Sequence, residues 1–318
     1  METRGPKTIQ KRKKVSCKTL TLMWINRYYY LLLLPAILFF VLFKYVPMAG
    51  IVLAFKDYSF QGGIWGSKWV GFEHFERLFS SASFYEILRN TLLISIYKLI
   101  FCFPVAIIFA LLLNEIKNIR FKKMIQTISY LPYFISWVVL GTIIMELLSP
   151  SQGVVNYLLG LVGIEPIHFL ADTKYFRGVL VATDIWKNVG WDSIIYLSAI
   201  AGVDIAQYES ASIDGANRWD KAIRITLPSI MPTIVTMFIL RMGSIMDGSF
   251  DQIFNLYNEI VYSVADTIDT YVYRVGLTDM QYDYTTAVGL FKNVIGFTLV
   301  ILSNYIVRHI GEGENKLW

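Results

Sequence analysis

Residues 208–232 read YESASIDGANRWDKAIRITLPSIMP, a polar stretch that separates two apolar segments of the chain. Asp204, just ahead of this stretch, is followed three residues later by a glutamine, the spacing of a capping box at the start of a helix. Gly215 suits a tight turn, because a residue without a Cβ can reverse the chain without strain. Asn217 can cap a second short helix, and Pro228 fits the first turn of the helix that follows. The pattern therefore predicts two short helices, joined by a turn, between two longer apolar ones.

This stretch resembles the cytoplasmic coupling loop, or EAA loop, of the permease subunits of binding-protein-dependent ABC importers. The pattern of that loop is E-A-A, three variable residues, G, a spacer and I-x-L-P. Here ESA at residues 209–211, DGA at 214–216 and ITLP at 225–228 stand for its parts. The resemblance implies that residues 204–228 dock on an ATPase subunit and transmit its closure to the membrane helices; the alternative is an ordinary amphipathic connecting loop. The implied ATPase-coupling residues are Glu209, Ser210, Ala211, Asp214, Gly215 and Ala216.

The composition of the chain favours a membrane protein. Of its 318 residues, 55% are hydrophobic and only 17% are charged, whereas about a quarter are charged in soluble domains. A soluble core of this size cannot hide so many apolar side chains, but a bilayer can solvate them. The two cysteines, Cys17 in a basic tail and Cys102 in an apolar run, predict no disulfide.

Six apolar runs each approach the ~20 residues that are needed to cross a bilayer core of ~30 Å. They predict an all-α membrane protein with six transmembrane helices. The runs are residues 28–55, 88–113, 124–148, 178–201, 230–246 and 287–307. The expected organisation is a basic cytoplasmic tail (1–27), a transmembrane domain (28–310) that contains the 204–228 loop, and a short cytoplasmic tail (311–318). We interpret the first run as an uncleaved span, because its basic flank is too long for a signal peptide and no small-residue cleavage site follows.

The distribution of Lys and Arg predicts the orientation. Segments on the same side as the N-terminus carry 17 of these residues, against six on the other side. The positive-inside rule therefore places both termini and the 204–228 loop in the cytoplasm, where ATP is found. The same rule explains the eight basic residues before Tyr28 better than nucleic-acid binding does, and we expect no nucleic-acid partner.

Polar and aromatic side chains within the apolar runs are candidates for a substrate pathway. A charge at membrane depth costs roughly 2.5–3.5 kcal/mol on insertion scales, so it usually faces other helices or water. Asp184 and Lys187 lie three apart on one helical face and can pair. Aromatic rings of the same run offer faces on which sugar rings stack. The candidates are Asp184, Trp186, Lys187, Asn188, Trp191, Asp192, Tyr196, Arg241 and Asn293; the alternative is that they only bridge helices or lie near the outer interface.

Outside the 204–228 loop, the chain resembles one branch of the family, the LplB-type carbohydrate permeases, which includes alginate and rhamnogalacturonan oligosaccharide importers. The resemblance is carried by YVPMAGIVLAFKDYSF from Tyr45, DIWKNVGWDSIIYLSAIAGVD from Asp184, FDQIFNLYNEIVYSVADTIDTYVYRVGL from Phe250 and TAVGLFKNVIG from Thr286. Glu259 departs from the branch, where Pro commonly follows Leu-Tyr-Asn, so the shape of this loop is open.

This resemblance implies a MetI-like helical core that works by alternating access in a bacterial cytoplasmic membrane, surrounded by lipid. The implied partners are a second homologous permease subunit, two ABC ATPase subunits that bind ATP and Mg, an extracellular or periplasmic solute-binding protein, and an oligosaccharide substrate.

The sequence itself indicates no enzyme. It contains no G-x-x-x-x-G-K-[ST] phosphate loop, and its three histidines are scattered without a metal-ligand spacing. We therefore expect no catalytic residue, metal or cofactor in this chain. Two alternatives stay open: a secondary transporter driven by an ion gradient, and a membrane sensor or scaffold that keeps the permease fold without transporting.

Overall fold

A computed structural model describes residue 22 and residues 24–310. The predicted C-terminal tail and most of the predicted N-terminal tail lie outside these residues. The chain forms two compact units, Met1–Val52 and Leu53–Trp318.

The first unit is built around an apolar helix. It comprises α2 (Arg27–Phe40), the π-helical turn η1 (Val41–Tyr45), α3 (Val46–Met48) and the beginning of the 3₁₀ helix η2 (Ala49–Phe55). Together these elements form a candidate membrane span, Arg27–Phe55. All side chains of α2 are exposed, which suits a helix whose solvent is lipid.

The second unit holds the remaining helices and one small hairpin. Its first half comprises β1 (Lys56–Asp57), α4 (Gly63–Gly66), β2 (Lys68–Trp69), α5 (Glu73–Ser80), α6 (Ala82–Glu115), α7 (Ile119–Tyr130), η3 (Leu131–Phe134), α8 (Trp137–Leu147) and α9 (Val154–Leu161). Its second half comprises α10 (Thr173–Ala201), α11 (Ile205–Ile213), α12 (Arg218–Lys221), η4 (Ala222–Thr226), α13 (Leu227–Ser229), α14 (Met231–Gly243), α15 (Phe250–Leu256), η5 (Glu259–Val261), α16 (Tyr262–Ala265), α17 (Ile268–Tyr273), η6 (Arg274–Thr278) and α18 (Tyr282–Ile310). Strands β1 and β2 pair antiparallel, a hairpin that the sequence analysis does not predict.

Within the described residues, three helices are long and apolar enough to cross a membrane: Arg27–Phe55, Ala82–Glu115 and Tyr282–Ile306. Three further spans arise if each bent helix pair is counted as one, which gives the predicted six. These pairs are Ile119–Phe134 with Trp137–Leu147, Thr173–Ala201 with Ile205–Ile213, and Arg218–Ser229 with Met231–Gly243. The sequence therefore indicates the fold class, while three of its predicted runs belong to broken elements.

The sharpest break lies in the third predicted run, where the helices turn by 105°. Pro132 lies in the short 3₁₀ helix η3, and the backbone of Ile135 and Ser136 is then extended. Ser136 restarts the helix, because its Oγ accepts the backbone N–H of Val139 at 3.4 Å. Pro132 is the sequence signal for this break, since proline ends or kinks a helix.

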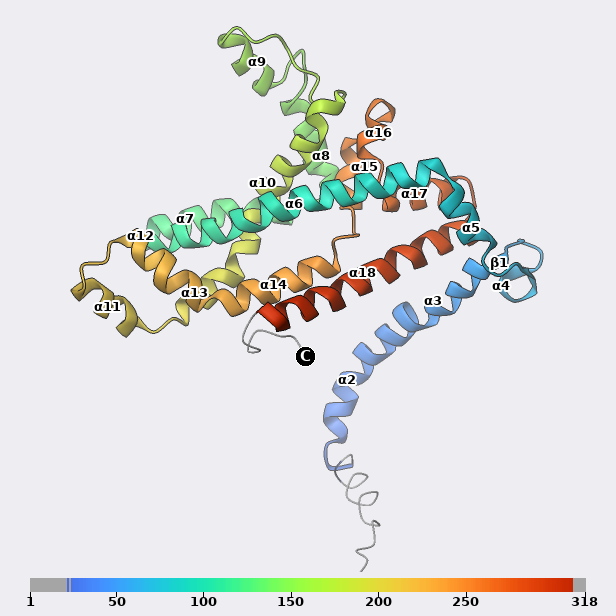
Figure 1. Cartoon of the computed structure of the whole chain (residues 1–318), viewed down its shortest axis with the longest axis horizontal. Coiled ribbons are helices and arrows are strands. Elements are labelled where there is room, and N and C mark those ends of the chain that lie inside the picture. Colours follow the sequence, from blue (N-terminus) through green and yellow to red (C-terminus); the bar gives the residue numbers. More distant parts are fainter. Residues whose placement is uncertain (1–21, 23, 311–318) are drawn as a thin grey trace, which may run out of the picture. The chain divides into compact units, whose positions relative to one another are not determined.

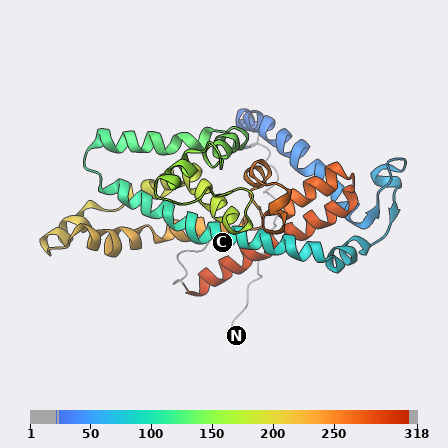
Figure 2. The same ribbon diagram turned by 90° about the horizontal axis from the view of Figure 1, so that it is seen from above.

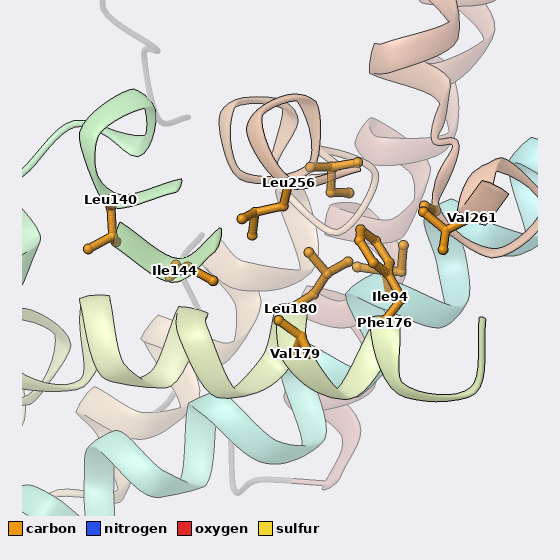
Figure 3. Close-up of a cluster of buried hydrophobic side chains, with 10 residues drawn as sticks. Ile94, Leu140, Ile144, Phe176, Val179, Leu180, Leu256 and Val261 are labelled. Atoms are coloured by element: carbon orange, nitrogen blue, oxygen red, sulfur yellow. The ribbon is translucent and has the colours of Figure 1, made fainter. Parts of the chain in front are cut away.

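A hydrophobic core holds the second unit together around the break. Figure 3 shows side chains of α6, α8, α10 and the α15–η5 segment that point toward one another. Its central members are Ile94, Leu140, Ile144, Phe176, Val179, Leu180, Leu256 and Val261. In both Figure 1 and Figure 2, α11 and α12 lie at one end of α6, and α5 with the β1–β2 hairpin lies at the other. The 204–228 loop is therefore far from the hairpin, as opposite membrane sides require.

Candidate functional site

The 204–228 loop folds as the sequence predicts, because local capping bonds define it. Asp204 accepts the backbone N–H of Ala206 at 3.0 Å and begins α11 as a simple N-cap, without the capping box that its spacing to Gln207 predicts. Gly215 then adopts φ +79°, the left-handed turn conformation that favours glycine. Asn217 and Asp220 form a reciprocal capping box at the start of α12. Two short helices and a glycine turn are thus confirmed.

Contacts between the two halves make the loop a braced unit. The Tyr208 hydroxyl lies 2.8 Å from Thr226 Oγ1, and Lys221 Nζ donates to Ser212 Oγ at 2.6 Å. Thr226 is buried, so its hydrogen bonds are shielded from water. These contacts tie α11 to α12 and η4.

The surface of this loop is exposed and partly apolar. Of the six implied coupling residues, Glu209, Ser210, Asp214 and Gly215 are exposed, whereas Ala211 and Ala216 are half-buried. The sequence reading missed the two most exposed apolar side chains of this surface, Ile213 at 87% exposure and Trp219 at 73%. Exposed apolar groups on a rigid projection suit a protein-docking surface.

A second candidate site is a cavity of about 530 Å³, which we call the central cavity. Six helices (α6, α8, α10, α14, α15 and α17) and the α14–α15 connection contribute to its wall. It is lined by Ser95, Lys98, Leu99, Trp137, Asp184, Asn188, Arg241, Ser244, Ile245, Asp247, Ser249, Phe250, Asp251, Gln252 and Asp269. A neighbouring cavity of about 560 Å³ shares Trp137, Asn188 and Asp251 with it, so polar groups continue beyond one chamber.

Lys98 organises the central cavity from the middle of α6. Its Nζ donates to Asp184 Oδ1 at 3.1 Å, to Ser249 Oγ at 2.7 Å and to Gln252 Oε1. Gln252 Nε2 donates in turn to Leu180 O at 2.7 Å. Lys98 and Asp184 are both buried, and a buried charge is tolerated only when it is paired and hydrogen-bonded. This polar network joins α6, α10 and the start of α15.

The ion pair of Asp184 is thus with Lys98, not with Lys187 as the spacing allowed. Lys187 instead donates its three protons to the carbonyls of Pro132 (3.2 Å), Tyr133 (3.0 Å) and Ile135. The chain breaks at these carbonyls, of which that of Pro132 also accepts the backbone N–H of Ile135 at 3.2 Å. Lys187 therefore supplies N–H donors where the helix no longer does.

The same face of α10 presses against the broken segment. The Trp191 ring stacks on Tyr133 with centroids 4.3 Å apart. A Cβ on Gly190 would lie 2.2 Å from the carbonyl oxygen of Ser129, so only glycine permits this approach. Lys187, Gly190 and Trp191 therefore position the break that carries Trp137 into the cavity wall.

The other predicted pathway residues lie in varied surroundings. Asp184, Asn188 and Arg241 line the central cavity, and Lys187 lines its neighbour. Trp186 and Asn293 are exposed, Asp192 is half-buried, and Tyr196 is buried in a hydrophobic cluster with Ile107 and Ile230. The sequence reading missed Lys98, Trp137, Ser249, Gln252 and Asp269. Lys98 carried a usable signal, a charge within an apolar run, whereas the others are recognisable only from tertiary contacts.

A second ion cluster closes one wall of the cavity. Lys292 Nζ lies 2.8 Å from Asp247 Oδ1 and 2.5 Å from Asp269 Oδ1. Asp269 Oδ2 also accepts the backbone N–H of Gly248 at 3.1 Å. This cluster links α18 to α17 and the α14–α15 connection. Among the residues that the structure describes, no group of acidic, histidine or cysteine side chains could hold a metal ion.

The loop around Glu259 keeps a defined shape. Asn258 accepts the backbone N–H of Ile260 at 3.0 Å, and Glu259 is the first residue of η5, a position that proline also suits. Farther along, Asp266 binds Arg274 with an O–N distance of 2.5 Å and raises the pKa of this guanidinium above its usual value.

Membrane-length helices, polar cavities between them and a braced, exposed loop at one end define a membrane permease subunit rather than an enzyme. Comparison with known proteins identifies the family of this permease subunit. Residues 102–312 match the family described as "Binding-protein-dependent transport system inner membrane component". The chain belongs to this family of ABC importer permeases, which are multi-pass inner-membrane components. In such an importer, ATP is bound by the ATPase and not by the permease.

Relatives extend the match over nearly the whole chain. Protein LplB of Bacillus subtilis (strain 168) is 45% identical over 89% of both chains. The polygalacturonan/rhamnogalacturonan transport system permease protein YteP of the same organism is 43% identical and covers 95% of this chain and 93% of its own.

A solved structure extends the match to the fold. The crystal structure of a bacterial ABC transporter involved in the import of the acidic polysaccharide alginate contains a chain that is 40% identical. The two superpose with a TM-score of 0.85 over 92% of this chain and 99% of that one. A second crystal structure shows the alginate transporter in complex with an alginate pentasaccharide-bound periplasmic protein. The predicted MetI-like permease core is confirmed.

Proposed function

We propose that this chain is the membrane-spanning subunit through which an ABC importer moves oligosaccharides from polysaccharide breakdown into the cytoplasm. The relatives named for polygalacturonan, rhamnogalacturonan and alginate support this substrate class. The observation that carries the proposal is the connectivity of the chain: the 204–228 loop is the segment that connects α10 to α14. Both helices contribute to the central cavity, α10 through Asp184 and Asn188 and α14 through Arg241.

The proposed assembly follows from the two ends of the second unit. Two ATPase subunits work beneath the permease pair, and one of them binds the 204–228 loop. A second, homologous permease completes the pathway, and a periplasmic or extracellular binding protein delivers the saccharide at the end with the β1–β2 hairpin. Residues 28–310 then form the transmembrane domain in a bacterial cytoplasmic membrane, with both tails in the cytoplasm.

The mechanism is mechanical coupling through a stiff lever. Closure of the ATPase dimer displaces the surface around Glu209 and Asp214, and the braces at Thr226 and Lys221 carry this motion to α14. Because α10 and α14 both border the cavity, their relative movement exposes it to one side of the membrane at a time. Such rigid-body motion of helices is a common basis of alternating access.

The direct test is the ATPase activity of the complex reconstituted with its partner permease, ATPase and binding protein. We expect stimulation that requires both binding protein and saccharide. Gly215→Val should abolish it, because φ +79° is strained for a β-branched residue. Gly163→Val is the matched control, since Gly163 also has a positive φ (+80°) and open space around it but lies in the α9–α10 loop.

The alternatives give different results in the same preparation. Uptake that survives ATP depletion but not an uncoupler would indicate an ion-driven transporter. Saccharide-dependent partner binding without accumulation would indicate a sensor or scaffold. Normal stimulation in the Gly215→Val variant would contradict the coupling role of the loop.

A further inference from the structure

Most charged side chains of the central cavity are paired with one another, but Asp251 of its lining has no ion pair among the residues that the structure describes. Lys98 neutralises Asp184 at 3.1 Å, and Lys292 lies between the carboxylates of Asp247 and Asp269. These pairs come from the protein itself, so they hold the wall together without a ligand. Groups that are already paired contribute little binding free energy to a substrate, because binding must first break those pairs.

Arg241 is the exception among the basic residues of this wall. It lies near the end of α14, is half-buried and lines the cavity. Among the described residues, its guanidinium makes neither a hydrogen bond nor an ion pair. Asp192 and Lys98 are charged groups within electrostatic reach of it. An arginine is costly to place in an apolar span, so one without a bonded partner is by default a functional group.

The chemistry of Arg241 selects one kind of ligand. A guanidinium presents a planar fork of N–H donors that matches the two oxygens of a carboxylate, with a charge-assisted hydrogen bond to each. The same cavity offers the Trp137 ring as a face for a sugar ring, and it offers Asn188 and the exposed Asp251 as partners for hydroxyl groups. These groups together match a sugar that carries a carboxylate on one carbon and hydroxyls on the others.

We propose that Arg241 binds the carboxylate of a uronate unit, so that the permease itself, and not only the binding protein, reads the acidity of the oligosaccharide. This inference rests on the proposed function of the chain as an oligosaccharide importer. The surrounding carboxylates limit the site to one anionic group, because a second carboxylate in the cavity would meet Asp251 rather than a free cation. Arg241 therefore fixes the position of one uronate at a time.

The test compares two probes of equal length: trigalacturonate, and the same trisaccharide with its carboxyl groups reduced to hydroxymethyl groups. Each is supplied to the reconstituted complex at concentrations that saturate the binding protein. Uptake of trigalacturonate should fall at least tenfold in Arg241→Gln and by an intermediate factor in Arg241→Lys, which keeps the charge but loses the fork. Uptake of the reduced probe should change less than twofold. Arg120→Gln, which removes an exposed charge from α7, is the matched control.

The outcomes separate this inference from the proposed function. Two results would overturn the role of Arg241 but not the function as an importer. One is an equal loss of uptake for both probes in Arg241→Gln, and the other is a wild-type complex that imports the reduced probe but not trigalacturonate. Import of neither probe nor of any other saccharide by the wild type would overturn the proposed function and this inference with it. If Arg241→Gln fails to assemble, the probe-dependent difference in Arg241→Lys decides the question.

Discussion

The 204–228 loop and the central cavity are held together in opposite ways. Every bond described above within the loop joins residues fewer than 20 positions apart, and much of its surface is exposed. The polar network of the cavity joins residues 72 to 154 positions apart and is almost wholly buried. The loop is thus stabilised by contacts within one short segment, whereas the cavity depends on contacts between helices that are far apart in the sequence. Changes in the cavity should therefore affect stability first, and changes in the loop should affect coupling first.

The largest expected effect is that of Lys98→Met. Removal of this cation leaves the carboxylate of Asp184 buried without its partner, which costs about 3–5 kcal/mol in comparable pairs. We expect a loss of folded complex, measured by thermal unfolding in detergent. The double variant Lys98→Met with Asp184→Asn should be more stable than Lys98→Met alone, because no charge is then stranded. Equal stability of the two variants would show that the pair does not hold the cavity together.

A smaller loss is expected from Gly190→Ala. Its Cβ would lie 2.2 Å from the backbone oxygen of Ser129, and neither helix can move without disturbing the Lys187 contacts. Overpacking of this kind typically costs about 1–3 kcal/mol. Gly178→Ala is the control on the same helix, since its Cβ would meet nothing within 4 Å. Thermal unfolding of both variants checks the prediction, and a Gly190→Ala protein as stable as the control would contradict it.

These two regions also explain what the sequence could predict. The helix caps, the Gly215 turn and the ITLP run depend on residues that are close together in the sequence, so the sequence predicts the two short helices and the turn of this loop. The partners of Lys98 and Lys187 come from other helices, and a helical pattern cannot tell which distant element a side chain will meet. Spacing therefore suggested a pair between Asp184 and Lys187, but the packing of α6 against α10 brings Lys98 to Asp184 instead. The bend at Pro132 was readable in principle, but its angle depends on carbonyl partners from α10.

Trp219→Ala should separate coupling from stability. The side chain is 73% exposed, so its removal should leave the unfolding temperature unchanged. If it anchors the ATPase, the affinity between permease and ATPase should fall by about 30-fold, the effect of losing a hot spot of about 2 kcal/mol. Trp65→Ala is the control, because Trp65 is equally exposed (75%) but lies by the β1–β2 hairpin. Unchanged ATPase affinity in Trp219→Ala would place the docking surface elsewhere on the loop.

The smallest expected effect tests whether the loop is a stiff lever. Tyr208→Phe removes only the hydroxyl that lies 2.8 Å from Thr226 Oγ1, a hydrogen bond worth about 0.5–1.5 kcal/mol. Because this brace is internal to the loop, the unfolding temperature of the complex and its affinity for the ATPase should stay nearly constant. The number of ATP molecules hydrolysed per saccharide imported should nevertheless rise, since a looser lever transmits closure less completely. Tyr157→Phe, which alters an exposed hydroxyl on α9, is the control. An unchanged ratio would mean that the remaining contacts of Lys221 and Ser212 suffice to carry the motion.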